Sequence, residues 1–362
     1  DFKTLKNKTS FIFKDNKFET FPNIWLRDHV KNEENWDFKT NQRTTFTANI
    51  DLNIKIRKAK ILENGKYIEI LWSNEIKPVR YSYNFLKENS LKKKEIKKDL
   101  YYWKNTDIKN QIFLSYNHIL TKKGFKNLLK KINKYGFAVI RNCSKDLKSV
   151  KKIANKIGYV RNSIFGGLWT FESNNKKADS AYSNQELRPH TDSTYSNDAP
   201  GLQLLLCCKY KAKGGDSIMV DGFKLAEEIK KKNISYFKTL TKTIVKGSYI
   251  GDGVRLEAER PIIKLNNKND FDQISFNNYD RAPFRDTNQK TINFYKAIKL
   301  FDTLANHEKY QWRHILKPGE LLIFNNWRVM HGRGAFSGIR KMAGCYINKE
   351  DFDSCCRINN IN

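Results

Sequence analysis

The sequence lacks any stretch close to the roughly 20 consecutive apolar residues that a membrane-spanning helix requires. Its first residues do not show the pattern of a signal peptide. Cysteine is scarce, with six among 362 residues, no C-x-x-C pair and two adjacent doublets, and this pattern argues against a disulfide framework. These absences predict a protein with no membrane segment in a reducing compartment, in the first place the bacterial cytoplasm, with a mitochondrion as the alternative.

Acidic residues are few beside basic ones, with 38 Asp and Glu against 68 Lys and Arg and a net charge of +30. Such a balance raises the question of nucleic-acid binding. Lysine is scattered along nearly the whole chain, however, and Asn and Ile are abundant beside it. A compositional bias with a solvated lysine-rich surface is therefore favoured over a nucleic-acid partner, and a salt titration of binding would separate the two.

Apolar residues are plentiful, at 39% with 23 Phe, 17 Tyr and 7 Trp, so the chain can form a substantial core. Short alternating segments at 54–62 and 67–72, separated by Asn64-Gly65, predict a hairpin within a small N-terminal β domain over residues 1–88. A highly charged stretch follows, and we expect a connector over 89–115. The remaining residues, 116–362, would form the second and larger domain.

Within this second domain, apolar residues at helical spacing predict helices over 122–134, 146–157 and 289–304. Apolar runs at 138–140, 202–208, 217–220 and 321–324 predict buried strands. Helices that precede a mainly antiparallel β array are typical of an α+β, mainly β protein. We therefore expect a jelly-roll barrel with helices packed outside it.

The most informative motif is His190-Thr191-Asp192, followed far downstream by His331 and Arg340. In an extended segment, residues i and i+2 point to the same side, so His190 and Asp192 can hold one cation together. Two imidazoles and one carboxylate are the set that binds non-haem Fe(II) on one face and leaves positions open for a co-substrate and dioxygen. Arg340 could bind the carboxylate of such a co-substrate through two parallel hydrogen bonds. Zinc is the rival metal, but the set shows no nearby general base for a hydrolase.

Several longer motifs carry a family resemblance. They are residues 21–29 (FPNIWLRDH), 187–192 (LRPHTD), 214–223 (GGDSIMVDGF), 276–282 (FNNYDRA) and 324–333 (FNNWRVMHGR). The chain resembles the trimethyllysine dioxygenase and γ-butyrobetaine hydroxylase family of 2-oxoglutarate-dependent Fe(II) oxygenases of carnitine biosynthesis, over most of its length. The resemblance implies a double-stranded β-helix catalytic domain and a homodimer.

The resemblance also implies roles for individual residues and small molecules. His190, Asp192 and His331 would be the Fe(II) ligands, and Arg340 would bind 2-oxoglutarate, with Ser217 and Leu205 beside it. Dioxygen would be the other co-substrate, and ascorbate would serve as the reductant. Hydroxylation would release succinate and CO2.

A quaternary ammonium has no N–H group, so aromatic faces recognise it through cation–π attraction. By resemblance, the aromatic cage would consist of Phe165, Trp169, Tyr182 and Tyr346, with Phe165 where the family has a Tyr. The remaining substrate contacts implied are Asp179, Tyr195, Asn277, Asn278 and Arg281.

The resemblance leaves two substrates open. Trimethyllysine carries an α-ammonium that γ-butyrobetaine lacks, and acidic Asp179 would complement a cation and repel a carboxylate. Arg281 could hold the amino-acid carboxylate, or it could form a structural ion pair instead. We expect C3 hydroxylation of Nε-trimethyllysine, with γ-butyrobetaine or a related quaternary ammonium as the alternative. A non-catalytic module that binds quaternary ammonium groups is a further alternative, which succinate release would exclude.

One departure from the family lies in the N-terminal domain, where relatives hold a structural zinc ion with a cysteine cluster. No Cys occurs before Cys143. Without thiolates a closed tetrahedral zinc site is not expected. We therefore predict that the domain is held by its apolar core and dimer contacts without zinc.

Overall fold

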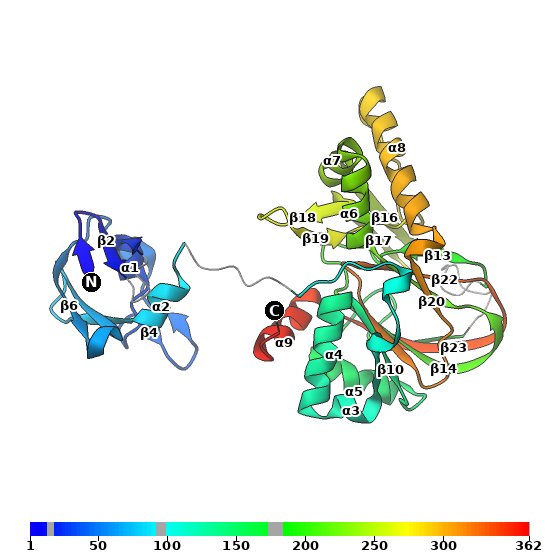
Figure 1. Cartoon of the computed structure of the whole chain (residues 1–362), viewed down its shortest axis with the longest axis horizontal. Helices are drawn as coiled ribbons and strands as arrows, with labels where there is room; N and C mark the ends of the chain where they lie inside the picture. Colours follow the sequence, from blue (N-terminus) through cyan, green and yellow to red (C-terminus); the bar gives the residue numbers. More distant parts are fainter. Residues whose placement is uncertain (13–17, 92–98, 173–183, 362) are drawn as a thin grey trace. The chain divides into compact units, whose positions relative to one another are not determined.

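The computed structural model describes residues 1–12, 18–91, 99–172 and 184–361. The chain forms two compact units, Asp1–Ile96 and Lys97–Asn362 (Figure 1). Among the described residues, no helix has both the length and the apolar character needed to cross a membrane.

The first unit is built from short antiparallel sheets. Its strands are β1 (Phe2–Thr4), β2 (Lys8–Ile12), β3 (Phe18–Pro22), β4 (Trp36–Asp37), β5 (Gln42–Arg43), β6 (Ile56–Leu62), β7 (Tyr67–Trp72) and β8 (Val79–Ser82), and its helices are α1 (Asn23–Asp28) and α2 (Tyr83–Glu88). The predicted hairpin is confirmed: β6 pairs antiparallel with β7, and Asn64 and Gly65 take positive φ in the turn. Leu26, Ile70 and Trp72 are fully buried at the centre of the core of this unit.

A polar network centred on Asn35 fixes the loop that follows α1. The Asn35 side chain accepts hydrogen bonds from Arg27 Nη1 (3.0 Å) and Thr45 Oγ1 (2.6 Å) and donates to Asn32 Oδ1 (2.6 Å). Asn35 is buried, so its loss would leave these partners unsatisfied. These bonds tie α1 to the loop around Asn32 and Asn35 and to the segment at Thr45.

The Asn35→Ala substitution should therefore lower the free energy of unfolding of the first unit by about 2 kcal/mol, the cost of unpaired buried polar groups. Urea unfolding of the full chain would measure this change. Asn53→Ala, at an exposed position, is the matched control and should leave the transition within about 0.5 kcal/mol of wild type. Equal effects of the two substitutions would contradict a structural role for the network.

The second unit has an α+β jelly-roll core of two β-sheets. The larger sheet contains β9 (Phe113–Ser115), β10 (Phe137–Arg141), β11 (Val160–Arg161), β12 (Trp169–Glu172), β14 (Leu202–Gly214), β21 (Leu321–Asn325) and β23 (Phe336–Ile347), in the order β11-β23-β14-β21-β10-β9 with β12 paired to β23. The smaller sheet contains β13 (Leu187–His190), β15 (Ser217–Asp221), β20 (Gln311–His314) and β22 (Val329–Arg333), in the order β13-β22-β15-β20. Apart from the parallel pair β9 and β10, all these strand pairs are antiparallel.

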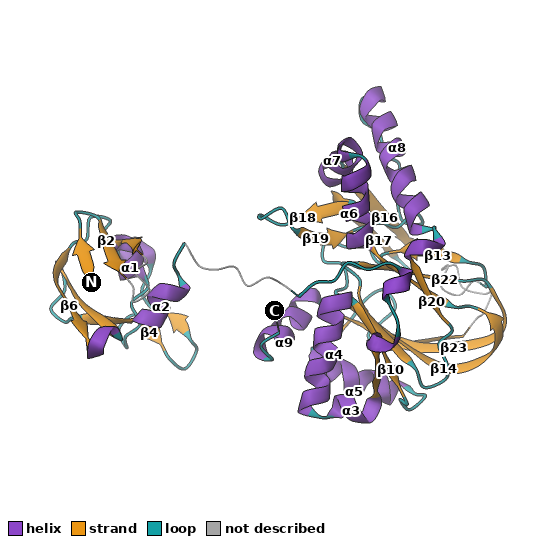
Figure 2. Cartoon of the chain, viewed as in Figure 1, coloured by secondary structure: helices purple, strands orange, loops and turns teal. Residues whose placement is uncertain are grey.

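The apolar runs in the sequence arise because central strands are covered on both faces. On β10, Phe137 and Val139 join the core between the two sheets, whereas Ala138 and Ile140 pack beneath helices. The helices of this outer layer are α3 (Tyr116–Leu120), α4 (Lys122–Tyr135), α5 (Leu147–Ile157) and α9 (Lys349–Ile358) (Figure 2). The predicted helices at 122–134 and 146–157 are thus confirmed as α4 and α5.

A mixed segment is inserted between β15 and β20. It contains α6 (Gly222–Lys232), α7 (Ile234–Lys242), β16 (Ile244–Gly251), β17 (Val254–Pro261), β18 (Ile263–Leu265), β19 (Phe271–Ile274) and α8 (Asn288–Ala305). Helix α8 confirms the helix expected at 289–304. The hairpin β16–β17 is bridged at Gly247 to Arg281 and so reaches the loop that follows β19.

Residues 99–115, which are part of the connector expected over 89–115, pack within the second unit. Trp103 is fully buried in the core between the sheets, and β9 joins the edge of the larger sheet. The backbone N–H of Trp103 donates to Asp221 Oδ2 (3.1 Å), and its indole N–H donates to the carbonyl of Tyr135 (2.7 Å). These contacts are long-range, which is why local charge and spacing did not reveal them.

Candidate functional site

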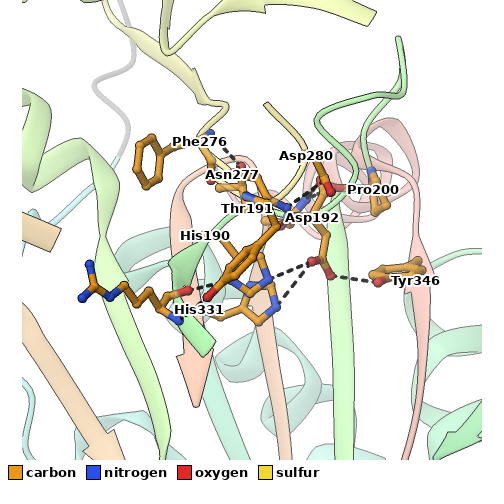
Figure 3. Close-up of polar contacts among 12 residues, drawn as sticks. His190, Thr191, Asp192, Pro200, Phe276, Asn277, Asp280, His331 and Tyr346 are labelled. Carbon is orange, nitrogen blue, oxygen red and sulfur yellow. Dashed lines mark hydrogen bonds and ion pairs between the residues drawn. The ribbon is translucent and has the colours of Figure 1, made fainter. Parts of the chain in front are cut away.

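Two neighbouring strands bring the His-x-Asp motif and the distant histidine together. Strand β13 pairs with β22, and His190 lies directly opposite His331 in this register. Asp192 follows two residues after His190, and its Oδ1 lies 3.4 Å from His190 Nε2 and 3.6 Å from His331 Nε2 (Figure 3). The ligand atoms of these three residues all lie within 4.8 Å of one another. Such a cluster can surround a single cation.

Hydrogen bonds and burial set the protonation of the three groups. His190 Nδ1 lies 2.8 Å from the Arg188 carbonyl, so Nδ1–H donates and Nε2 faces the cluster. Burial alone would raise the pKa of Asp192, but His331, His190 and the Tyr346 hydroxyl hold it well below its usual range. Burial lowers the pKa of His331 to about 4, so its imidazole is neutral near pH 7. An anionic carboxylate beside a neutral imidazole is what a divalent metal requires.

The carboxylate is also fixed from outside the cluster. Tyr346 donates its hydroxyl to Asp192 Oδ2 (2.8 Å). Asn326, which is 1% exposed, accepts from the Asp192 N–H (2.8 Å) and donates to the carbonyls of Asp192 (3.2 Å) and Pro200 (3.0 Å). The Thr191 N–H donates to the Phe276 carbonyl (2.7 Å), which holds the segment from its other side (Figure 3). Interactions of this kind orient metal ligands.

The donor set fits an Fe(II) ion. Nitrogen and carboxylate ligands on one face suit this ion, and the cavity on the other side leaves room for further ligands. The buried Nδ1 of His331 has no hydrogen-bond partner among the described residues. A metal at Nε2 would fix the tautomer in which Nδ1 carries the proton.

A cavity of about 440 Å³ opens onto the triad. It is lined by most of the residues expected from the sequence: His190, Asp192, His331, Arg340, Ser217, Leu205, Phe165, Trp169, Tyr195, Asn277 and Tyr346. These residues come from both sheets and from connecting segments, so the jelly roll itself brings them together.

One end of the cavity is cationic. Arg340 is 7% exposed, and no carboxylate of the described residues lies within ion-pair distance of its guanidinium. Arg333 lies close enough that burial, together with the charge of Arg340, lowers its pKa to about 10. The buried Arg340 guanidinium, on the same cavity as the Ser217 hydroxyl, forms a site for a carboxylate, because a buried cation is costly without an anion.

Aromatic rings line another part of the wall. The rings of Trp169 and Tyr346 have centroids 5.8 Å apart, and Trp169 also stacks on Phe171 at 5.5 Å. Gly344 permits this arrangement, because a Cβ there would come within 2.3 Å of the Trp169 ring. With Phe165, these rings offer faces that can contact a quaternary ammonium.

Some expected substrate residues lie elsewhere. Arg281 does not line the main cavity; its guanidinium lies 5.6 Å from the Tyr295 ring centroid and donates to Asn278 Oδ1 (3.0 Å). Arg281 and Asn278 therefore interact with each other outside the cavity wall. Asp179 and Tyr182 fall outside the described residues, so their proposed roles stay predictions.

The cavity also contains residues that the sequence reasoning did not select: Phe171, Leu187, Ser193, Gln203, Ser248, Tyr249, Ile250, Tyr279, Asp280, Gly332, Arg333 and Met342. Phe171 lies two residues after Trp169, and Met342 lies two residues after Arg340. Alternate residues of a strand share a face, so Trp169 and Arg340 could have indicated these two neighbours. No local signal indicates Ser248, Tyr249 and Ile250. They reach the cavity because the hairpin β16–β17 folds against the 276–282 loop.

Comparisons with known proteins agree with this geometry. Residues 104–346 match the family described as "Taurine catabolism dioxygenase TauD, TfdA family", and residues 3–87 match "Gamma-butyrobetaine hydroxylase-like, N-terminal". The chain is 32% identical to the mitochondrial trimethyllysine dioxygenase of Gallus gallus, over 93% of this chain and 83% of that protein. It is 30% identical to the trimethyllysine dioxygenase of Meyerozyma guilliermondii, over 94% of this chain and 90% of that protein.

A solved structure supports the fold. The crystal structure of AAD-2 in complex with Mn(II) and N-oxalylglycine superposes with a TM-score of 0.53 and 12% identity, over 67% of this chain and 96% of that one. The family matches cover most of both units, and the His-Asp-His cluster lies inside the larger match. The chain therefore belongs to the TauD/TfdA dioxygenase family and, within it, to the group of trimethyllysine dioxygenases and γ-butyrobetaine hydroxylases.

Proposed function

We propose that the protein is an Fe(II)- and 2-oxoglutarate-dependent dioxygenase that hydroxylates Nε-trimethyllysine at C3. The single observation that carries this proposal is the position of His190, Asp192, His331 and Arg340 on one 440 Å³ cavity. 2-Oxoglutarate has two carboxylates. One can bind the metal that the triad holds, and the other can bind the separate, buried guanidinium of Arg340. The similarity to trimethyllysine dioxygenases from animals and yeast supports the choice of substrate.

His190, Asp192 and His331 would hold the iron, and Arg340, with Ser217 and Leu205, would hold the distal end of 2-oxoglutarate. The bound iron supplies the oxidising chemistry, in which trimethyllysine, 2-oxoglutarate and dioxygen yield hydroxytrimethyllysine, succinate and CO2. Tyr346 keeps the Asp192 carboxylate in place, and Asn326 holds the Asp192 backbone, through the hydrogen bonds described above. The protein side chains thus mainly position the iron and 2-oxoglutarate and supply the charges that bind them.

The aromatic wall would hold the trimethylammonium group. Phe165, Trp169 and Tyr346 line the cavity, and we propose that they contact the cation through their ring faces, with Tyr195 on the neighbouring wall. Because Tyr346 also donates to Asp192, its position links the end that binds the cation to the metal ligands. This link would place the side chain of the substrate at a fixed depth relative to the triad.

The test is mass spectrometry of trimethyllysine and γ-butyrobetaine incubated with the full chain, Fe(II), ascorbate and 2-oxoglutarate. We expect trimethyllysine to gain one oxygen atom, with one succinate formed per product. γ-Butyrobetaine hydroxylation is the second candidate, favoured by the match of residues 3–87 to the N-terminal domain of γ-butyrobetaine hydroxylases. Faster turnover of γ-butyrobetaine would overturn the first choice, and no oxygen transfer to either would overturn the proposal.

Arg340 provides a prediction about the co-substrate. Arg340→Ala should raise the KM for 2-oxoglutarate by about 10- to 100-fold, since a charge-assisted hydrogen bond contributes about 1.5–3 kcal/mol. Initial rates of succinate formation at varied 2-oxoglutarate would measure it. Arg313→Ala is the control, because Arg313 lies on the smaller sheet and is paired with Asp216. It should leave this KM unchanged. An unchanged KM in Arg340→Ala would remove the residue from this role.

We further propose a homodimer, an N-terminal β domain over 1–88 that holds no zinc, and an oxygenase domain over 116–362 together with the segment 99–115 that packs within it. The compartment we propose is a reducing one, cytoplasmic or mitochondrial, in keeping with six free cysteines. The Gallus gallus relative is described as mitochondrial. Sedimentation and metal analysis of the full chain would test the dimer and the absence of zinc.

A further inference from the structure

Asp280 is an acidic residue on the cavity wall that the proposed chemistry has not yet used. It lines the same cavity as the metal triad, on the loop that follows β19. Its Oδ2 accepts a hydrogen bond from Asn277 Nδ2 (2.8 Å), and Asn277 also lines the cavity (Figure 3). A carboxylate can accept several hydrogen bonds at once, so the bond from Asn277 is compatible with another from a ligand.

The loop that carries Asp280 is held rigidly beside the metal segment. At one end, Phe276 exchanges hydrogen bonds with Thr191, through Thr191 N–H to the Phe276 carbonyl (2.7 Å) and Phe276 N–H to Thr191 Oγ1 (3.0 Å). In the middle, the Tyr279 ring lies edge-on to the His190 ring, with centroids 5.8 Å apart. The Ser248 N–H donates to the Asp280 carbonyl (2.8 Å), which attaches the loop to β16.

The chemistry of the substrate indicates what this position would meet. In trimethyllysine, C3 is two bonds from the α-nitrogen, so hydroxylation at C3 requires the α-ammonium to lie next to the metal triad. In both molecules C3 is two bonds from the carboxylate carbon, but C2 of γ-butyrobetaine carries no ammonium. A group beside the triad is therefore placed to distinguish the two molecules.

We propose that Asp280, oriented by Asn277, binds the α-ammonium of the substrate and so selects an amino acid over a simple betaine. This inference rests on the proposed function and deepens it. An anionic oxygen accepts a strong hydrogen bond from an ammonium and repels a carboxylate that has no ammonium beside it. Asp280 thus performs at a described position the selection that the sequence suggested for Asp179.

The experiment compares two substrates in the same protein sample: trimethyllysine and 6-(trimethylammonio)hexanoate, which differs only by the absence of the α-ammonium. In Asp280→Asn, kcat/KM for trimethyllysine should fall about 10- to 100-fold, while kcat/KM for the analogue stays level or rises. Because both substrates are measured on one sample, a partly unfolded fraction cancels in the ratio. Asp280→Glu, which keeps the charge, should retain the preference for trimethyllysine at a reduced rate.

Asp286→Asn is the matched control, since Asp286 is an exposed acid six residues along the same loop that pairs with Lys290 and does not line the cavity. It should leave both values of kcat/KM unchanged. Equal losses for the two substrates in Asp280→Asn, or no loss for either, would overturn the inference and leave the proposed function standing. Failure of the wild-type chain to hydroxylate trimethyllysine would instead overturn the proposed function, before any variant is compared.

Discussion

Asp192→Asn should reduce trimethyllysine-dependent succinate formation by at least about a thousandfold, because a bound metal ion contributes several kcal/mol to catalysis and each 1.36 kcal/mol is tenfold in rate. The substitution keeps the size of the side chain and can still accept from the Tyr346 hydroxyl. It removes the only negative charge among the three ligands, and the metal is then held by two neutral imidazoles.

The measurement is succinate release by the full chain at saturating iron and 2-oxoglutarate. Asp353→Asn makes the same chemical change on α9, where Asp353 pairs with Lys349 at the surface, and it should retain wild-type activity. Thermal unfolding of both variants separates loss of metal from loss of fold. Activity within tenfold of wild type in a folded Asp192→Asn protein would contradict the role of Asp192 as a ligand.

Arg328→Ala should lower the free energy of unfolding of the second unit by about 3–5 kcal/mol, the cost of breaking a buried ion pair. The Arg328 side chain is 1% exposed and donates to both oxygens of Asp221, at 3.0 and 2.7 Å. It also donates to the carbonyls of Asn133, Lys134 and Tyr101. One guanidinium thereby joins the C-terminal turn of α4, the start of α6 and the segment before β9.

Urea unfolding of the full chain would measure this loss. Arg255→Ala removes an exposed pair with Glu257 and should cost less than about 1 kcal/mol. In a double variant with Asp221→Ala, the total loss should be smaller than the sum of the single losses, because no charge is then left buried without its partner. Additive losses would show that Arg328 and Asp221 do not act as a pair.

The sequence predicted those features that depend on local periodicity. The spacing of two in His190-Thr191-Asp192 placed both side chains on one side, and the structure has them within reach of one cation. Apolar residues at helical spacing located α4, α5 and α8 to within a few residues. The register that sets His190 opposite His331, by contrast, was not predicted, because it depends on strand order.

Features that depend on long-range contacts were not predicted. Trp103 lies in a segment whose charge suggested a connector, yet it is buried through contacts with Asp221 and Tyr135. Arg281 was expected to contact substrate, but its neighbour Asp280 is the one on the cavity wall. Adjacent residues in a loop can point in different directions, and sequence gives no period to distinguish them. Arg333 was passed over for a similar reason, since only the fold places it beside Arg340.

The central claim is that His190, Asp192 and His331 bind one ferrous ion between them, and anaerobic equilibrium dialysis against Fe(II), followed by metal analysis of the full chain, tests it most directly. The structure predicts one iron per wild-type chain and a large loss of iron in His331→Ala, because two of the three ligand atoms cannot enclose the ion. Wild-type iron content in a folded His331→Ala protein would contradict the claim.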